Sequence, residues 1–200
     1  MNDHYYSEKP RVESERKTWT YQLKGNTFTF HSDKGVFSKN EVDFGSKLLI
    51  ETFQMPEIEG PILDIGCGYG PIGLSLAKEY PAIKVDMVDI NERAVELSKE
   101  NAKVNRIENV QVFQSYLFEE ISKKKYAAIL TNPPIRAGKK VVHEIFEKSY
   151  THLYSGGELW VVIQKKQGAP SAIEKLNELY SEADVIEKKK GYYIICAKKY

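Results

Sequence analysis

Three closely spaced glycines, Gly66, Gly68 and Gly70, are the first residues whose spacing points to chemistry. An apolar run at 62–65 precedes them, and the residues from Pro71 onward have the pattern of a helix. A buried strand would then lead into a helix through a loop with almost no side chains. Glycines let a backbone approach a ligand closely, and the amides at the start of a helix can donate to it. The stretch is therefore a candidate nucleotide-binding junction.

The spacing of this loop argues against a dinucleotide. The dinucleotide fingerprint is GxGxxG, but here the third glycine comes one residue early and Pro71 takes its place. Asp64 precedes the glycines, and Asp89 lies near the end of a second apolar run at 85–90, where a carboxylate can accept from both hydroxyls of a ribose. This pattern resembles that of the class I S-adenosylmethionine-dependent methyltransferases. A tight turn in another α/β protein is the alternative.

The second informative motif is Asn132-Pro133-Pro134. Two prolines fix the backbone after the asparagine, so the Asn132 side-chain carbonyl and the Pro133 main-chain carbonyl can act as paired acceptors. Paired acceptors would hold an amino group with its lone pair turned toward a sulfonium methyl, and transfer then needs positioning more than a strong base. A plain turn is the alternative, since Asn-Pro often begins turns. We expect Asn132 and Pro133 to be the catalytic residues.

This motif resembles the (D/N/S)PP(Y/F/W) signature of amino-methyltransferases that act on adenine, guanine or glutamine. The fourth position here is Ile135, which cannot stack as an aromatic ring would. Phe37, or an aromatic residue of the amino-terminal hairpin, is the candidate replacement, although such residues are more often core residues.

The remaining patterns describe the elements that position these motifs. Alternation around Gly25 and Asn26 predicts a β-hairpin over 19–30, and Asp43 can cap a helix that carries Leu48, Leu49 and Phe53. Ala94, Leu97, Asn101 and Val104 form one stripe of a helix at 92–105. Further strands are expected at 110–113, 126–130, 159–163, 185–186 and 192–197, and further helices at 140–150 and 170–180, with a break at 155–157.

Alternating strands and helices predict an α/β fold: a Rossmann-like, doubly wound sheet of seven mostly parallel strands, the last antiparallel, preceded by the hairpin. Ligands bind such sheets beyond the carboxyl ends of the strands, where strand order reverses. The glycine loop, Asp89, Ser115 and Asn132 should therefore meet in one crevice.

Composition limits the class of protein. The chain of 200 residues is 42% hydrophobic with a net charge of +1, which suits one domain. We expect a flexible tail at 1–17 and a single methyltransferase domain at 18–200. Cys67 and Cys196 lack metal-ligand spacing, the histidines form no ligand set, and no signal peptide or membrane span is visible. A soluble, cytoplasmic, metal-free monomer is expected.

Longer stretches narrow the resemblance. HSDKGVFS, VDFGSKLLIETF, NPPIRAGKK and LYSGGELWVVIQKKQG are similar to the methyltransferase small domain of bacterial ribosomal RNA guanine-N2 methyltransferases, from about residue 28 to the end. The family typically has NPPFH where this chain has Ile135 and Arg136, and a carboxylate near the adenine where it has Gln114-Ser115. The resemblance implies S-adenosylmethionine as cofactor and ribosomal RNA or the small ribosomal subunit as partner.

The same resemblance implies the roles of individual residues. Ser38 and Asp43 would close over the methionine end of the cofactor. The cofactor residues that we expect are Asp64, Gly66, Cys67, Gly68, Asp89, Ile90, Ser115, Tyr116 and Asn132. The substrate residues that we expect are Phe37, Pro134, Ile135, Arg136 and Lys165.

Lysine runs at 139–140, 165–166 and 188–190 should form a basic rim on the crevice face, whereas 123–125 should lie on the opposite face. A rim that contacts phosphates favours an RNA substrate, although lysine turns can also serve solubility alone. Three readings stay open: an RNA guanine amino-methyltransferase, an enzyme of the same class that acts on protein glutamine or on adenine, and a cofactor-binding module without turnover. A nicotinamide oxidoreductase is disfavoured by the glycine spacing.

Overall fold

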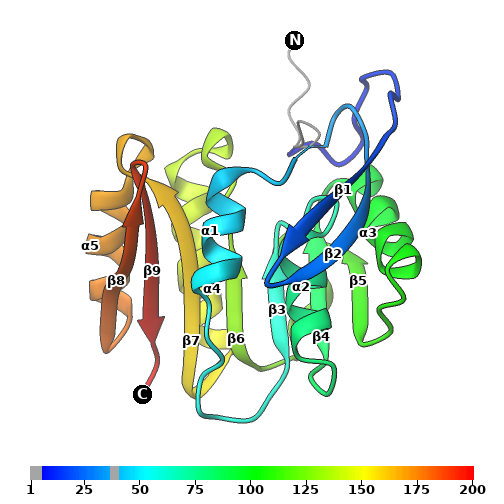
Figure 1. Ribbon diagram of the computed structural model, residues 1–200. Coiled ribbons are helices and arrows are strands. Elements are labelled where there is room, and N and C mark those ends of the chain that lie inside the picture. Colours follow the sequence, from blue (N-terminus) through cyan, green and yellow to red (C-terminus); the bar gives the residue numbers. More distant parts are fainter. Residues whose placement is uncertain (1–5, 37–40) are drawn as a thin grey trace.

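The computed structural model describes residues 6–36 and 41–200. Seven strands form the main sheet in the order β5-β4-β3-β6-β7-β9-β8, and β1 and β2 form a separate antiparallel pair (Figure 1). The strands are β1 Lys17–Leu23, β2 Asn26–Ser32, β3 Ile62–Ile65, β4 Val85–Asp89, β5 Val110–Gln114, β6 Tyr126–Thr131, β7 Leu153–Gln164, β8 Glu182–Lys189 and β9 Tyr192–Lys198. The helices are α1 Phe44–Thr52, α2 Pro71–Glu79, α3 Glu92–Val104, α4 Lys139–His152 and α5 Ala169–Leu179, with short 3-10 turns η1 Glu119–Ile121, η2 Ile135–Ala137 and η3 Lys165–Gln167.

The predicted fold is confirmed. Strands β3 to β7 pair in parallel, and β9 runs antiparallel between β7 and β8. The chain first builds outward from β3 through β4 to β5, then returns to β6 on the other side of β3. The order of the strands therefore reverses between β3 and β6, and the glycine loop and the Asn132 loop follow these two strands.

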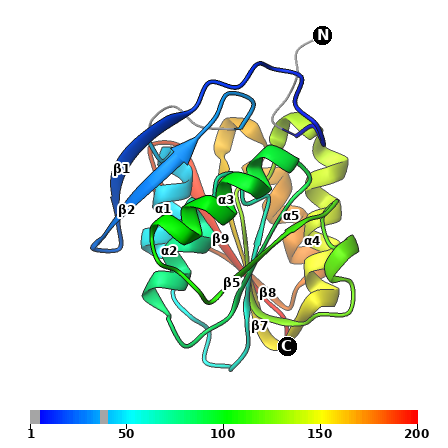
Figure 2. The ribbon, with the colours of Figure 1, turned by 90° about the vertical axis from the view of Figure 1, so that its right-hand side faces the viewer.

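Helices cover both faces of the sheet (Figure 2). Helices α1, α2 and α3 contribute to one apolar cluster, and α4 and α5 contribute to the cluster on the other face. Every residue of β3 and of β6 is buried, because both strands are covered on two sides. The two loops that carry the candidate chemistry thus leave from the most enclosed part of the sheet.

Asparagines of α3 fasten the hairpin to the domain. The side chain of Asn101 accepts from His31 N at 2.8 Å and donates to His31 O at 2.9 Å, as a neighbouring strand would. It also donates to Tyr69 O in the glycine loop at 2.7 Å. One turn later, Asn105 makes the same pair of bonds with Thr29. These amides satisfy backbone groups of the β2 edge and tie the hairpin to the loop.

Three expectations about the elements need correction. Val104 does not join the buried stripe of α3 but is 46% exposed, because it lies in the last turn of that helix. The break expected at 155–157 is instead an irregularity within β7, where Gly156 N and Gly157 O bond to Lys199. Residues 6–16, which we expected to be a free tail, lie against the domain: Glu92 N donates to Glu8 O, and Arg16 pairs with Glu100 at 2.9 Å.

None of the helices in the described part of the chain is both long and apolar enough to cross a membrane.

Candidate active site

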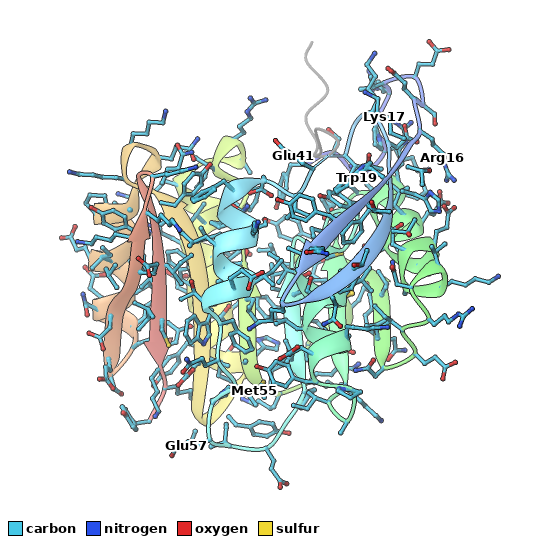
Figure 3. All side chains as sticks on the ribbon, in the orientation of Figure 1. Arg16, Lys17, Trp19, Glu41, Met55 and Glu57 are labelled. Atoms are coloured by element: carbon cyan, nitrogen blue, oxygen red, sulfur yellow. The ribbon has the colours of Figure 1, made fainter. Side chains whose placement is uncertain are left out.

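A cavity of about 570 Å³ is lined by residues that follow the carboxyl ends of the central strands. These strand ends lie at the top of Figure 1. Figure 3 shows Glu41, just before α1, at this end of the molecule, whereas Met55 and Glu57, which follow α1, lie at the other end. Of the residues expected at the site, the cavity is lined by Gly66, Cys67, Gly68, Asp89, Ile90, Ser115, Asn132, Pro133, Pro134, Ile135 and Arg136. The predicted convergence of loops that are far apart in sequence is therefore present.

The glycine loop presents bare backbone to this cavity. Gly66 has φ of 73° and Gly68 has φ of 57°, a region that side chains disfavour, and a Cβ at either position would point into open space. The loop thus has the form of a cradle. Gly70 differs, because a Cβ there would lie 2.8 Å from the Leu74 side chain. Glycine at position 70 is therefore required by the packing of α2 and not by a ligand.

Asp89 is fixed at the end of β4 by backbone donors. Gly68 N donates to one carboxylate oxygen and Asn91 N to the other, each at 2.9 Å. Burial raises the pKa of Asp89 to about 6, and these hydrogen bonds oppose the rise. Each oxygen retains lone pairs, so the carboxylate can still accept from two hydroxyl groups.

Asp64 is located differently from the other cofactor candidates. It is fully buried, does not line the cavity, and accepts from Gly73 N at 2.9 Å. Burial raises its pKa to about 7. We expected the amides at the start of α2 to be available to a ligand. The Gly73 amide in the first turn is not, because it donates to Asp64. Asp64 therefore ties the end of β3 to the first turn of α2.

The side-chain amide of Asn132 is held by the start of α1. Its Nδ2 donates to Asp43 Oδ2 at 3.2 Å and to Ser46 Oγ at 3.0 Å. Because a carboxylate can only accept, the nitrogen must face Asp43, which fixes the orientation of the amide. Both N–H groups are then occupied within the protein. The carbonyl oxygen, Oδ1, is left as the acceptor that Asn132 can offer to the cavity.

Asp43 performs a second task at the same place. Its Oδ2 also accepts from Ser46 N at 3.0 Å, the N-cap bond that begins α1. The helix cap predicted at this residue is confirmed. Asp43 also lines the cavity, at the end of α1 that contacts Asn132.

Other predicted residues are placed as follows. The hydroxyl of Ser115 donates to Leu117 O at 3.0 Å, so it serves the turn after β5. Tyr116 lies outside the cavity lining and donates to Glu144 at 3.1 Å. Cys67 is a free, buried thiol whose pKa is raised by burial. The candidates Phe37 and Ser38 lie outside the described residues.

Three lysines of the predicted basic rim, Lys165, Lys166 and Lys190, lie beside the site. Lys165 and Lys166 follow β7, and the turn at Lys190 sits beside them, since Lys165 N donates to Gly191 O at 2.9 Å. All three line a second cavity of about 510 Å³ that has no acidic residue in its lining and shares Gln164 with the first. Lys165 thus borders the neighbouring cavity, not the main one. On the opposite face, Lys124 is not free in solvent but pairs with Asp86 at 2.9 Å.

Several lining residues were missed by sequence reasoning: Tyr6, Ser46, Tyr69, Gln164, Gln167 and Tyr192. Ser46 and Tyr192 belong to elements whose positions were predicted, but nothing in their local pattern indicated that they face a cavity. Tyr6 belongs to the segment expected to be a tail. Residues 6–36 and 41–200 contain no group of histidine, cysteine, aspartate and glutamate side chains that could hold a metal ion.

The chain is similar to known proteins over most of its length. A family model described as methyltransferase small domain matches residues 27–196. The chain is 66% identical, over the full length of both proteins, to a Bacillus subtilis protein named YbxB and described as uncharacterized. It is 33% identical to ribosomal RNA small subunit methyltransferase C of Vibrio cholerae, over 94% of this chain and 54% of the relative. The chain thus spans about half the length of that relative.

Solved structures show the same fold. The Thermus thermophilus 16S rRNA N2 G1207 methyltransferase, in complex with AdoMet and guanosine, matches with a TM-score of 0.84 and 24% identity over 96% of this chain and 52% of that one. A ribosomal protein L11 methylase from Lactobacillus delbrueckii matches with a TM-score of 0.66 and 18% identity over 82% of each chain.

Proposed function

Because this chain belongs to the methyltransferase small domain family, we propose that it transfers a methyl group from S-adenosylmethionine to the exocyclic N2 amine of a guanine in ribosomal RNA. The observation that carries the proposal is the orientation of Asn132. Its amide presents a carbonyl acceptor in the same cavity as the glycine loop and Asp89.

The cavity has the features that the cofactor needs. The bare backbone of Gly66 and Gly68 leaves room for a bulky ligand, and the fixed carboxylate of Asp89 can accept from the two ribose hydroxyls. When bound, S-adenosylmethionine supplies a methyl group on a positively charged sulfur. We assign Gly66, Gly68, Asp89 and the backbone near Ser115 to this ligand.

Asn132 is the group that would orient the amine. Its Oδ1 accepts one N–H of the substrate amine, and the carbonyl of Pro133 accepts the other, which turns the nitrogen lone pair toward the methyl carbon. As the N–C bond forms, the C–S bond breaks and its electron pair stays on sulfur. The substrate nitrogen then releases one proton to solvent. The acceptors also stabilise the positive charge that builds on the nitrogen during transfer.

An RNA substrate is supported by the charge around the site. Lysines at 165, 166 and 190 line the neighbouring cavity, and Arg136, Lys139 and Lys140 follow the Asn132 loop in the chain. Phosphates flanking a target nucleotide would meet these cations, and binding would weaken as salt increases. The named Vibrio relative is a ribosomal RNA methyltransferase. Protein glutamine is the second candidate substrate, since the same pair of acceptors suits a side-chain amide and one structural neighbour is a ribosomal protein methylase.

The test is transfer of a labelled methyl group. Purified protein is incubated with labelled S-adenosylmethionine and either ribosomal RNA from cells lacking the gene or the ribosomal proteins of the same cells. We expect label in the RNA as N2-methylguanine. Label in protein, or in adenine, would contradict the proposed substrate.

The variant Asn132→Ala separates transfer from cofactor binding. It should abolish transfer and leave the dissociation constant for S-adenosylmethionine within a few-fold of the parent. Asn177→Ala, the same change on the exposed face of α5, should do neither. Full transfer by Asn132→Ala would refute its assigned role.

A further inference from the structure

The proposed site lacks the aromatic residue that usually follows such a motif, since Ile135 occupies that position. A planar base needs a flat surface to stack on, and a branched aliphatic chain offers little. Among the described residues that line the cavity, the aromatic ones are Tyr6, Tyr69 and Tyr192. Their surroundings differ enough to separate them.

Two of these tyrosines belong to the cofactor side or to the core. Tyr69 is 3% exposed and its ring packs against Trp19 at 5.7 Å and Phe30 at 5.4 Å. Tyr6 lies near Tyr116, Glu144 and Asp89: burial chiefly raises its pKa, and these three groups add to the rise. Tyr69 is therefore a core residue, and Tyr6 lies on the side of the cavity where β4 and β5 end.

Tyr192 lies on the Asn132 side of the cavity. Its ring rests against Gly45, where a Cβ would come within 2.7 Å of Cε1, so only glycine admits the ring at this place. Gly45 stands between Asp43 and Ser46, the two residues that hold the Asn132 amide. The ring therefore lies about one side chain away from the candidate catalytic group.

Neighbours fix the ring of Tyr192 in this position. Phe44 packs beside it with centroids 5.5 Å apart, and the ammonium of Lys190 lies 4.8 Å from the centroid of Phe44. Backbone pairing of Tyr192 with Gln164 anchors the strand at the point where both cavities meet. The ring is partly exposed even so. A half-buried, firmly placed aromatic ring that lines a cavity is the kind of surface on which a base stacks.

We propose that Tyr192, at the start of β9, is the stacking platform for the target nucleobase and replaces the aromatic residue missing at 135. This inference rests on the proposed function for the identity of the base. The ligand that stacks on Tyr192 is a planar heteroaromatic base, and its exocyclic amine reaches Asn132. Lys190 then lies on the side where the RNA strand leaves the cavity.

The next residue provides a matched control. Tyr193 lies on the opposite face of β9, where it packs with the α4 and α5 cluster beneath Lys188. The variants Tyr192→Leu and Tyr193→Leu therefore make the same chemical change on opposite faces of one strand. Tyr192→Phe retains the ring, and Phe37→Leu tests the aromatic residue that the sequence suggested.

The first measurement is guanosine binding by NMR to protein saturated with S-adenosylhomocysteine. We expect ring-current shifts of the guanosine protons in the parent, Tyr192→Phe, Tyr193→Leu and Phe37→Leu proteins, and their loss in Tyr192→Leu. The second is methyl transfer to ribosomal RNA, where Tyr192→Leu should lower kcat/KM about 5-fold to 150-fold, the range spanned by one base–aromatic stack. Its affinity for S-adenosylmethionine should be unchanged.

The results separate this inference from the proposed function. Shifts that depend on Tyr192 in a protein that transfers no methyl group to RNA would support the platform and refute the function. Transfer that is equal in Tyr192→Leu and Tyr193→Leu would refute the platform alone. The platform would also be wrong if Phe37→Leu carried the loss, if Tyr192→Phe were as impaired as Tyr192→Leu, or if guanosine bound without ring-current shifts.

Discussion

Replacing Asp43 with alanine is the sharpest test of how the site is built, since one carboxylate oxygen caps α1 and holds Asn132. Loss of the cap should lower the free energy of unfolding by about 1 kcal/mol. Loss of a hydrogen bond to a charged acceptor is worth about 1.5 to 3 kcal/mol. If the second effect falls on the transition state, kcat should drop about 10-fold to 150-fold.

The assay is methyl transfer at saturating cofactor, with urea unfolding of the same preparations. Asp43→Asn keeps an oxygen that can accept both bonds, so its kcat should fall only a few-fold. Ser46→Ala removes one neutral bond to Asn132, worth about 0.5 to 1.5 kcal/mol, and should fall between the two.

Two results would refute this reasoning. Asp43→Ala could lose stability and keep its kcat, in which case α1 does not position the catalytic amide. Alternatively, Asp43→Asn could be as inactive as Asp43→Ala. In that case the negative charge of Asp43, and not its hydrogen bond to Asn132, would be what methyl transfer requires.

Three further predictions concern Asp89, Asp64 and Asn101. Affinity for S-adenosylmethionine should fall as the pH is lowered through about 6, where Asp89 takes up a proton; calorimetry from pH 5 to 8 checks this, and Asp89→Asn should bind weakly with little dependence on pH. The raised pKa of Asp64 means that the native state keeps a proton which the unfolded chain has released, so its contribution to stability declines as pH rises from about 4 to about 7. In urea unfolding, the parent should therefore lose stability relative to Asp64→Asn across that range, and a constant difference would contradict it. Asn101→Ala leaves three backbone groups of His31 and Tyr69 without partners and should lower the free energy of unfolding by about 3 kcal/mol in urea.

The sequence was sufficient for the fold because local pattern and topology agree throughout the sheet. Strands β3 and β6 are mostly apolar because both of their faces are covered. The rule that ligands bind beyond the carboxyl ends of the strands then predicted that Asp89 and Asn132 share one cavity. Periodicity failed at Val104, where the helix ends and its last turn leaves the core. It failed again at Gly156, because glycines within a strand can mark a bulge as well as a turn.

The site was only partly predictable, and the missing part has one physical cause. Motifs report residues that are close in sequence, whereas the amide of Asn132 takes its orientation from Asp43 and Ser46, 89 and 86 residues away. Tyr192 was missed for the same reason, since its contact with Gly45 joins the last strand to the first helix of the domain. Pairings of this kind leave no pattern in a single sequence.

The start of α1 therefore connects stability to chemistry in this domain. One oxygen of Asp43 accepts from the helix amide and from the catalytic amide, and the next residues, Phe44 and Gly45, support the ring of Tyr192. A change that improved the helix alone, such as a side chain at Gly45 to favour helical backbone, would push against that ring. We therefore expect Gly45→Ala to reduce guanosine binding even where it leaves α1 folded. A Gly45→Ala protein that binds guanosine as tightly as the parent would show that α1 and the base platform are independent.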